Sequence, residues 1–424
     1  MNPPSVFASI LTIGDELLIG QTIDTNSAWM AQQLNQIGIW VKRRVAVGDN
    51  REDIWQALDE ELKQSDIVLI TGGLGPTADD ITKPLLCDYF GGKLIIDPSA
   101  LSHVKYVFEE ILKRPLLERN LKQAEVPDNC TVLLNKRGTA PGMWFEKSAT
   151  NNEKKKIIVS LPGVPHEMKG LMADEVLTRL LHSFEMPKIL HRTLLTAGAG
   201  ESFIAERLQE WEEQLPPPYK LAYLPSFGMV RLRLTGIVTS ESSTIDLLFS
   251  QLKEKVKDIL VLEEDIKIEE RVGQLLKQTE KTVASAESCS GGYIAHLLTS
   301  IAGSSAYYKG TVVAYSYDAK ENLLGVNPNT LLNHGAVSSE TVKEMLAGLL
   351  SRTGADYGIA TSGIMGPDGG TTDKPVGTVW VAVGKKDNII SKSFHFRFDR
   401  QRNIQLTAAH ALLFLLRFLE QEEA

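Results

Sequence analysis

Residues 286–292 read Ala-Glu-Ser-Cys-Ser-Gly-Gly. A short apolar run precedes them and a pattern of helical spacing follows at 293–301, so the stretch predicts a strand, a sharp polar turn and a helix. Ser288, Cys289 and Ser290 fall in the turn. A helix N-terminus offers free N–H donors, which suits an anion or a developing oxyanion. A glycine-rich turn capped by serine, with no catalytic role, explains this stretch alone equally well.

Two further polar loops follow predicted strands in the same part of the chain. A strand at 311–317 contains Tyr315 and leads into a helix with Lys320 in its first turn, and a strand at 356–361 leads into the glycine-rich loop 362–370. Loops that follow the strands of one sheet can lie together at the same edge of that sheet. A serine with a nearby lysine is a known nucleophile–base pair, and a partly buried lysine loses its charge more easily.

Other residues of these loops have candidate roles around that pair. Tyr315 can relay a proton or orient the lysine, and the N–H groups of Ser290 and Gly291 can hold an oxyanion. Cys289 is a competing nucleophile, because thiolates are intrinsically more reactive. The three loops contain no strong histidine candidate to activate a thiol, so the pattern favours the serine. A long C-terminal helix begins near Asp399, and its Arg400 can bind a phosphate.

The N-terminal part alternates strands with helices. Residues 6–13, 41–47 and 67–71 are apolar runs typical of buried strands, and helical patterns at 28–37 and 53–62 separate them. This alternation predicts a parallel, doubly wound α/β sheet.

The loop after the third of these strands, residues 71–80, reads Thr-Gly-Gly-Leu-Gly-Pro-Thr-Ala-Asp-Asp. Ligands bind at the carboxyl ends of strands in open α/β sheets, and glycines allow the backbone to approach a phosphate closely. The expected phosphate contacts are Thr71, Gly72, Gly73 and Gly75. Carboxylates of this loop and of the loop after the first strand are candidate ligands for a hard divalent cation. These are Asp15, Glu16, Asp79 and Asp80. An acidic, solvated helix start is the alternative.

The patterns divide the chain into three domains. We expect a doubly wound α/β domain at 1–182, a small α+β domain at 187–262 and an α/β domain at 266–424, with a charged boundary at 263–270. The middle domain shows no catalytic constellation, so spacing and dimer packing are its expected roles.

The composition excludes several classes of protein. The 424 residues are 43% hydrophobic and 23% charged, which is typical of a soluble globular chain, and a net charge of −8 disfavours general binding to nucleic acid. Three widely spaced cysteines indicate neither a disulfide framework nor a structural zinc site, and a reducing cytoplasm fits. The start of the chain resembles a core strand more than a signal peptide, and the longest apolar run, 411–416, is too short to span a membrane.

Several separate motifs, in the order of the family, resemble the competence/damage-inducible protein CinA family. In the C-terminal part they are residues 282–292, 302–306, 315–320, 334–338, 362–370 and 375–380. The N-terminal part resembles the molybdopterin-binding-like domain of the same family, through residues 14–20, 71–80 and 162–168. The resemblance covers nearly the whole chain.

This resemblance implies a nicotinamide-nucleotide amidase, which converts nicotinamide mononucleotide and water to nicotinate mononucleotide and ammonia in pyridine nucleotide recycling. It implies that Ser288 is the nucleophile, Lys320 its base and Tyr315 a supporting group, with no cofactor. The substrate-binding positions that follow are Ser290, Gly291, Gly292, Ser362, Gly363 and Arg400. Relatives often have threonine at the position of Ser362. The loop before Arg400 is shorter than in some relatives, so Arg402 is a rival.

For the N-terminal domain, the resemblance implies an ADP-ribose pyrophosphatase that uses Mg, Mn or Co. The expected partners are small-molecule nucleotides and a second copy of the chain in a homodimer. Two alternatives belong to other classes: a non-enzymatic accessory protein of competence or DNA damage, and a molybdopterin-binding module. The acidic charge weighs against direct contact with DNA, and the amidase-like half argues that pterin binding is not the whole function.

Overall fold

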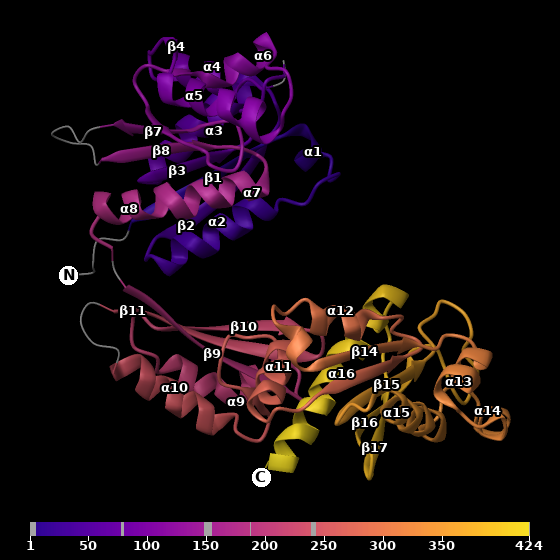
Figure 1. Cartoon of the computed structure of the whole chain (residues 1–424). Coiled ribbons are helices and arrows are strands. Elements are labelled where there is room, and N and C mark those ends of the chain that lie inside the picture. The colour runs from indigo at the N-terminus through magenta and orange to yellow at the C-terminus, as the bar shows by residue number, and fades with distance from the viewer. Residues whose placement is uncertain (1–5, 78–79, 148–154, 187, 239–242, 424) are drawn as a thin grey trace. The chain divides into compact units, whose positions relative to one another are not determined.

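The computed structural model describes residues 6–77, 80–147, 155–186, 188–238 and 243–423. The chain forms two compact units (Figure 1). The first comprises residues 1–191 and 235–245, and the second comprises 192–234 and 246–424. Within the described residues, no helix is long and apolar enough to cross a membrane.

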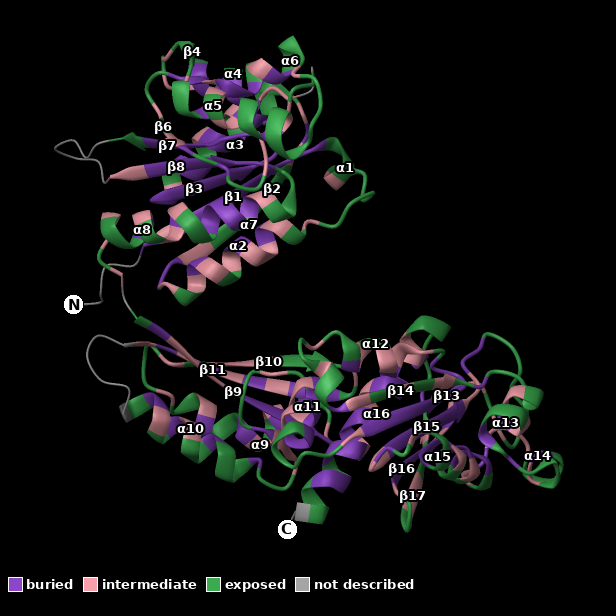
Figure 2. Ribbon diagram, in the orientation of Figure 1, coloured by how far each residue is buried: buried purple, intermediate pink, exposed green. Residues whose placement is uncertain are grey.

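The first unit contains a six-stranded mixed sheet. Its order is β2 (Trp40–Val47), β1 (Phe7–Ile13), β3 (Ile67–Thr71), β8 (Lys156–Leu161), β7 (Gly142–Lys147) and β6 (Thr131–Leu133). The strands from β2 to β8 are parallel, as the alternation of strands and helices predicts, whereas β7 and β6 are antiparallel. β3 is buried along its length (Figure 2). Ile67 and Leu69 pack on one side of the sheet, and Val68 and Ile70 pack on the other.

Helices cover both faces of this sheet, which confirms the α/β class. α2, α7 and α8 pack on one face, and α3 and α4 on the other. The helices and short helical turns of the unit are α1 (Asp15–Leu18), α2 (Thr25–Gln36), α3 (Arg51–Gln64), α4 (Thr82–Tyr89), α5 (Pro98–Tyr106), η1 (Val107–Ile111), α6 (Glu118–Leu121), η2 (Lys122–Ala124), α7 (Pro165–Leu171), η3 (Met172–Val176) and α8 (Leu177–Ser183). An antiparallel ribbon of β4 (Leu94–Ile96) and β5 (Glu125–Pro127) stands beside the sheet.

The second unit begins with a small α+β segment. Its four-stranded sheet has the order β10 (Lys220–Ser226), β11 (Met229–Val238), β9 (Lys188–Ala197) and β12 (Leu260–Leu262), with helices α9 (Glu201–Glu213) and α10 (Ser243–Lys255). Most of this segment belongs to the same compact unit as the C-terminal part.

The C-terminal part contains a five-stranded sheet. Its order is β14 (Tyr308–Val313), β13 (Val283–Glu287), β15 (Tyr357–Gly363), β16 (Thr378–Lys385) and β17 (Asn388–His395). The first three strands are parallel and the last two form an antiparallel hairpin. The helical elements are α11 (Ile268–Gln278), α12 (Tyr293–Thr299), η4 (Ser304–Ala306), α13 (Tyr317–Leu324), α14 (Pro328–His334), α15 (Ser339–Thr353) and α16 (Arg400–Glu423).

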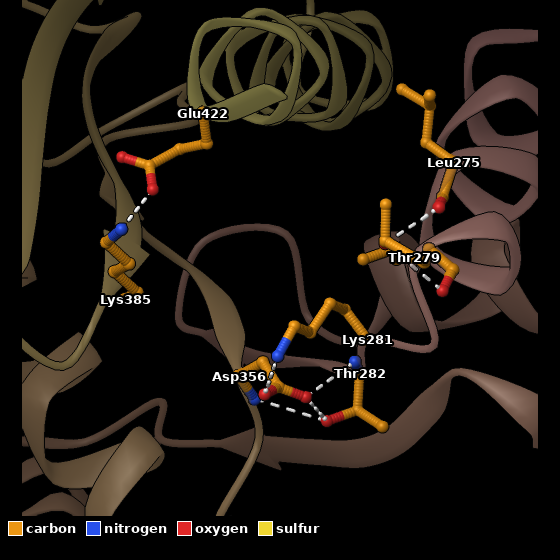
Figure 3. A network of polar contacts seen from close by, with 8 residues as sticks. Leu275, Thr279, Lys281, Thr282, Asp356, Lys385 and Glu422 are labelled. Carbon is orange, nitrogen blue, oxygen red and sulfur yellow. Dashed lines mark hydrogen bonds and ion pairs between the residues drawn. The ribbon is translucent and has the colours of Figure 1, made fainter. Parts of the chain in front are cut away.

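β13 is the strand that positions the loop quoted first. Val283 packs on the side of α11, α12 and α16, whereas Ala284 and Ala286 pack toward α15. At its start, the Asp356 carboxylate accepts hydrogen bonds from Thr282 N at 2.9 Å and Thr282 Oγ1 at 2.8 Å (Figure 3). This clamp joins the starts of β13 and β15, so the loops after both strands leave the sheet at one edge.

One expected element differs in the structure. The strand expected at 311–317 ends at Val313, because Ser316 caps a helix that starts at Tyr317: its hydroxyl accepts a hydrogen bond from Ala319 N at 3.1 Å. Residues 93–132 contain the β4–β5 ribbon, between whose strands Asp97 caps α5.

Candidate active site

Ser288 and Lys320 lie side by side at the edge of the C-terminal sheet. Ser288 directly follows β13, and Lys320 projects from α13. Lys320 Nζ lies 3.0 Å from Ser288 Oγ, 2.9 Å from the carbonyl oxygen of Ala314 and 3.1 Å from that of Tyr315. Lys320 is 1% exposed and Ser288 is 7% exposed. Burial lowers the pKa of Lys320, because desolvation disfavours the ammonium form.

The two carbonyl groups determine how Lys320 can interact with the hydroxyl of Ser288. A carbonyl oxygen only accepts hydrogen bonds, so Ala314 and Tyr315 each take one N–H of Lys320. A neutral amine has two N–H bonds and one lone pair. In the neutral form, the lone pair of Lys320 therefore remains for the hydroxyl of Ser288, which is the arrangement that a general base needs.

Cys289 points into the core instead of into this arrangement. It is buried within the hydrophobic cluster around α11, α12 and α16. Burial raises the pKa of its thiol to about 12, so the thiol stays protonated near neutral pH. The next residue, Ser290, is also buried, and its hydroxyl lies 2.8 Å from Thr361 Oγ1.

A buried carboxylate that the sequence analysis missed occupies the start of α12. Glu287 Oε2 accepts from the N–H groups of Gly292 at 2.9 Å and Ile294 at 3.1 Å, and Oε1 accepts from Ala295 N at 2.9 Å. Glu287 lies two and four residues from Ser285 and Val283, so the pleat of β13 turns it toward α12. An acidic residue at the end of an apolar strand, just before a helix, is the pattern that would have indicated it.

This carboxylate changes the expected role of the glycines. Gly292 N donates to Glu287, and Gly291 N donates to the carbonyl oxygen of Ser288 at 3.2 Å. In the described part of the chain, the N–H of Ser290 donates to no acceptor. Of the N–H groups proposed for an oxyanion, that of Ser290 is the one left available.

Arg400 reaches the same edge from the first turn of α16. Its Nη1 donates to the carbonyl oxygen of Gly366 at 2.8 Å, and its Nη2 donates to Tyr315 Oη at 3.0 Å. Arg402, the rival, lies elsewhere, with its guanidinium 4.8 Å from the ring centroid of Phe227. The structure therefore places Arg400, and not Arg402, with Tyr315.

Ser362 and Gly363 end β15 beside this cluster. Ser362 is buried, and its hydroxyl donates to the carbonyl oxygen of Ala336 at 2.6 Å. The sequence analysis missed Asn403, which is fully buried and donates to the carbonyl oxygens of Met365 at 3.1 Å and Phe398 at 2.9 Å. Asn403 thus fastens α16 to the loop that Arg400 contacts.

In the first unit, the glycine loop after β3 meets the loop after β1. Gly72 has a φ of +115°, and a Cβ there would lie 2.3 Å from the carbonyl oxygen of Ile13, so a side chain cannot fit. Thr71 Oγ1 donates to the carbonyl oxygen of Pro162 at 2.8 Å. Beside these loops lies a cavity of about 130 Å³, whose lining includes Glu16, Asp24 and Thr71.

Two of the candidate metal ligands of this unit, Asp15 and Asp80, are engaged in other contacts. Asp80 accepts from Gly75 N at 2.7 Å and Thr77 N at 2.9 Å, and so closes its own loop. Asp15 Oδ1 accepts from the N–H of Asp49 at 3.2 Å. Within the described residues, no three His, Cys, Asp or Glu side chains gather as a metal site would require.

Asp79 lies outside the described residues. The residues that are described, including Glu16 on the wall of the cavity, do not by themselves form a site for a divalent cation. The metal assignment therefore stays a prediction.

Comparison with known proteins places this site in a family. The model described as "CinA C-terminal domain" matches residues 265–419, "Probable molybdopterin binding domain" matches 9–182, and "Damage-inducible protein CinA KH domain" matches 191–262. A CinA-like protein of Cytophaga hutchinsonii is 44% identical over 98% of this chain and 99% of its own length. Another, of Flavobacterium psychrophilum, is 43% identical over 96% of each chain.

Among solved structures, a competence-damaged protein (CinA) superfamily protein of Klebsiella pneumoniae is 36% identical. The match covers 36% of this chain and 96% of that one, with a TM-score of 0.36. The full-length relatives carry the conclusion, since they match at more than 40% identity from one end to the other. The chain is a member of the CinA family.

Proposed function

We propose that the C-terminal part is an amidohydrolase that converts nicotinamide mononucleotide and water to nicotinate mononucleotide and ammonia. One observation carries the reaction type: the buried 3.0 Å contact between Lys320 Nζ and Ser288 Oγ, with two carbonyl groups taking the other N–H directions. The choice of substrate rests on the resemblance of the site loops to those of nicotinamide-nucleotide amidases.

The chemistry follows from this geometry. Neutral Lys320 takes the proton of Ser288 as Oγ attacks the amide carbon. The resulting oxyanion is stabilised by the N–H of Ser290. The protonated lysine then gives its proton to the leaving nitrogen, and ammonia departs from an acyl-serine ester. Water, activated by the same amine, hydrolyses the ester and releases the carboxylate.

In this proposal, Arg400 recognises the mononucleotide. The guanidinium of Arg400 is held by Gly366 and Tyr315, which fixes its planar fork at the rim of the site. Such a fork suits a phosphate group, because it can donate two parallel hydrogen bonds. Since the first turn of α12 is already occupied by Glu287, Arg400 is the group proposed to bind the phosphate.

The test is ammonia release from the full chain with three substrates: nicotinamide mononucleotide, nicotinamide riboside and nicotinamide. We expect the mononucleotide to be the best substrate, and Ser288→Ala to abolish its hydrolysis. Ser300→Ala, an exposed serine at the end of α12, is the matched control and should retain full activity. Equal hydrolysis by Ser288→Ala and Ser300→Ala would refute the serine mechanism.

A second activity belongs to the N-terminal unit in this proposal: metal-dependent hydrolysis of ADP-ribose. It rests on the family resemblance and on the small cavity lined by the segment after β1, the end of β3 and the segment after β8. Because the described carboxylates do not gather as a metal site, we assign no step to a metal there. A homodimer in the cytoplasm that acts on nucleotides completes the proposal.

The alternative of a DNA-directed accessory protein is less well supported. KH modules clamp nucleic acid with a G-x-x-G loop. The turn after β9 reads Gly198-Ala199-Gly200-Glu201, which lacks that spacing. The net charge of −8 also opposes contact with a phosphate backbone.

A further inference from the structure

The second unit contains a cavity apart from the Ser288–Lys320 site. Its volume is about 360 Å³, and it lies between the middle four-stranded sheet and helices α11, α12 and α16. Ser288, Lys320 and Arg400 are not among its lining residues. Most of its wall is apolar, including Leu224, Phe227, Met229, Leu297 and Leu412. A pocket of this size, apolar and with a few polar groups, is typical of a small-molecule site.

The wall of this cavity is built by close packing. The β10–β11 turn carries Phe227, at a φ of +51°, against the guanidinium of Arg402. The next residue, Gly228, lies so near His410 that a Cβ would be 2.8 Å from its Nε2. Because these contacts fix the turn on α16, the cavity is preformed and does not need a ligand to open it.

Glu269 is a buried, charged group on the wall of the cavity. Glu269 is 8% exposed and lines the cavity. Among the described residues its carboxylate has no hydrogen bond, and its one ion-pair contact is Lys267 Nζ at 3.9 Å. The Lys267 side chain is 68% exposed, so it stands at the rim. A buried carboxylate is unfavourable unless a donor or a cation meets it.

The wall also carries two cations, Lys267 at the rim and Arg231, and Arg231 is already engaged. Arg231 forms an ion pair with Asp265, and its Nη2 donates to the carbonyl oxygen of Ile266 at 3.4 Å. Glu269 lies in the first turn of α11, where a negative charge suits the helix dipole. That placement explains why the charge is tolerated. Among the described residues, Oε1 has only the 3.9 Å contact with Lys267 Nζ, and neither carboxylate oxygen accepts a hydrogen bond.

We infer that this cavity binds a small organic ammonium ion with an apolar, aromatic body. The ammonium group donates to the carboxylate of Glu269, and the body fills the space between Phe227, Leu297 and Leu412. This site is independent of the proposed amidase reaction, since none of its lining residues belongs to the Ser288–Lys320 cluster.

The experiment compares three probes that share one body and differ in the head group: tryptamine, 3-ethylindole and indole-3-propionate. Binding to the full chain is measured by titration calorimetry and ligand-observed NMR. We expect tryptamine to bind about tenfold more tightly than 3-ethylindole, as a charge-assisted hydrogen bond requires, and the propionate to bind most weakly. This comparison needs no variant, so it stands even if a substitution fails to fold.

Two variants locate the site. Glu269→Gln should remove the advantage of tryptamine over 3-ethylindole, whereas Glu210→Gln, which removes an exposed carboxylate of α9, should leave it unchanged. Leu297→Trp should fill the cavity and abolish binding of all three probes, with the fold checked by circular dichroism. Equal affinities for the three probes, no saturable binding of tryptamine, an unchanged preference in Glu269→Gln, or retained binding in folded Leu297→Trp would each overturn the inference.

Discussion

Arg400 and Tyr315 are 85 positions apart in the chain, yet Arg400 Nη2 donates to Tyr315 Oη at 3.0 Å. The bond joins the start of α16 to the segment after β14. The carbonyl oxygen of the same tyrosine accepts from Lys320 Nζ at 3.1 Å. Tyr315 thus contacts both Arg400, the residue proposed to bind the phosphate, and Lys320, the proposed base. It holds these two side chains at a fixed separation.

The first prediction concerns this arginine. Arg400→Ala should raise KM for nicotinamide mononucleotide by about 10- to 100-fold, the range for losing hydrogen bonds to a charged group. KM for nicotinamide riboside, which lacks the phosphate, should change little. Arg402→Ala is the matched control, because its guanidinium lies on Phe227. Steady-state kinetics on both substrates decide the matter, and a KM effect confined to Arg402→Ala would reverse the assignment.

The second prediction concerns pH. The neutral form of Lys320 is the proposed base, and burial lowers its pKa from the ordinary value of about 10.4. Activity should therefore rise with pH as the amine loses its proton, and reach a plateau above that lowered pKa. Lys320→Arg carries a group that stays charged, so its activity should fall by about 10³-fold or more. A pH–rate profile that falls toward alkaline pH in the wild type would contradict this role.

The third prediction separates Ser288 from Cys289. Ser288→Ala should lower kcat by a factor on the order of 10³ or more, whereas Cys289→Ala should keep most of the activity. Lys320→Ala should be nearly as damaging as Ser288→Ala, and the double variant little worse than either, because the pair acts as a unit. Ammonia release by the four variants is the measurement. An inactive Cys289→Ala beside an active Ser288→Ala would make the protein a cysteine amidase.

The fourth prediction concerns Glu287. Glu287→Gln keeps the shape but weakens the acceptor of three backbone N–H groups. We expect a loss of about 1–3 kcal/mol in the free energy of unfolding, together with lower activity, because α12 and the Ser288 loop lose their anchor. Asp318→Asn, an exposed carboxylate in the first turn of α13, is the control. Denaturant melts of both variants test this, and an unchanged midpoint for Glu287→Gln would show that the cap is dispensable.

The fifth prediction separates the two activities. EDTA should abolish hydrolysis of ADP-ribose by the full chain and leave ammonia release intact, since the Ser288–Lys320 chemistry needs no metal. Asp80→Asn should also reduce the pyrophosphatase, because it weakens the bonds that close the loop at Gly75 and Thr77. Release of AMP and of ammonia is followed in the same samples. An amidase that EDTA inhibits would argue against the serine–lysine mechanism.

Local pattern was enough to predict much of this structure. The apolar strand, polar turn and helix around Ser288 and the parallel core of the first sheet both follow from short-range periodicity. The antiparallel arrangement of β7 and β6 does not follow, because periodicity shows where strands lie and not which way they run.

Contacts between distant segments set the limits of prediction at the site. Arg400 and Arg402 both lie in the first turn of α16, about 200° apart around its axis. Which of the two arginines contacts Tyr315 therefore depends on how the helix is rotated about its axis, which the sequence does not show. The position of Glu287 between an apolar strand and a helix indicates a cap, but which N–H groups it accepts from depends on where the first turn of α12 lies in space. Similarly, Ser316 caps α13, so the preceding strand ends at Val313 and Tyr315 lies after it, not within it as expected.

The burial of Cys289 affects how the protein reacts with oxidants. Its sulfur is enclosed by the core, and its thiol stays protonated at neutral pH, so peroxide finds no thiolate at the reacting centre. The proposed nucleophile is an alcohol and its base an amine, neither of which is oxidised under such conditions. For the proposed amidase, we therefore expect turnover to persist in the presence of peroxide, whereas enzymes that depend on a reactive cysteine lose theirs.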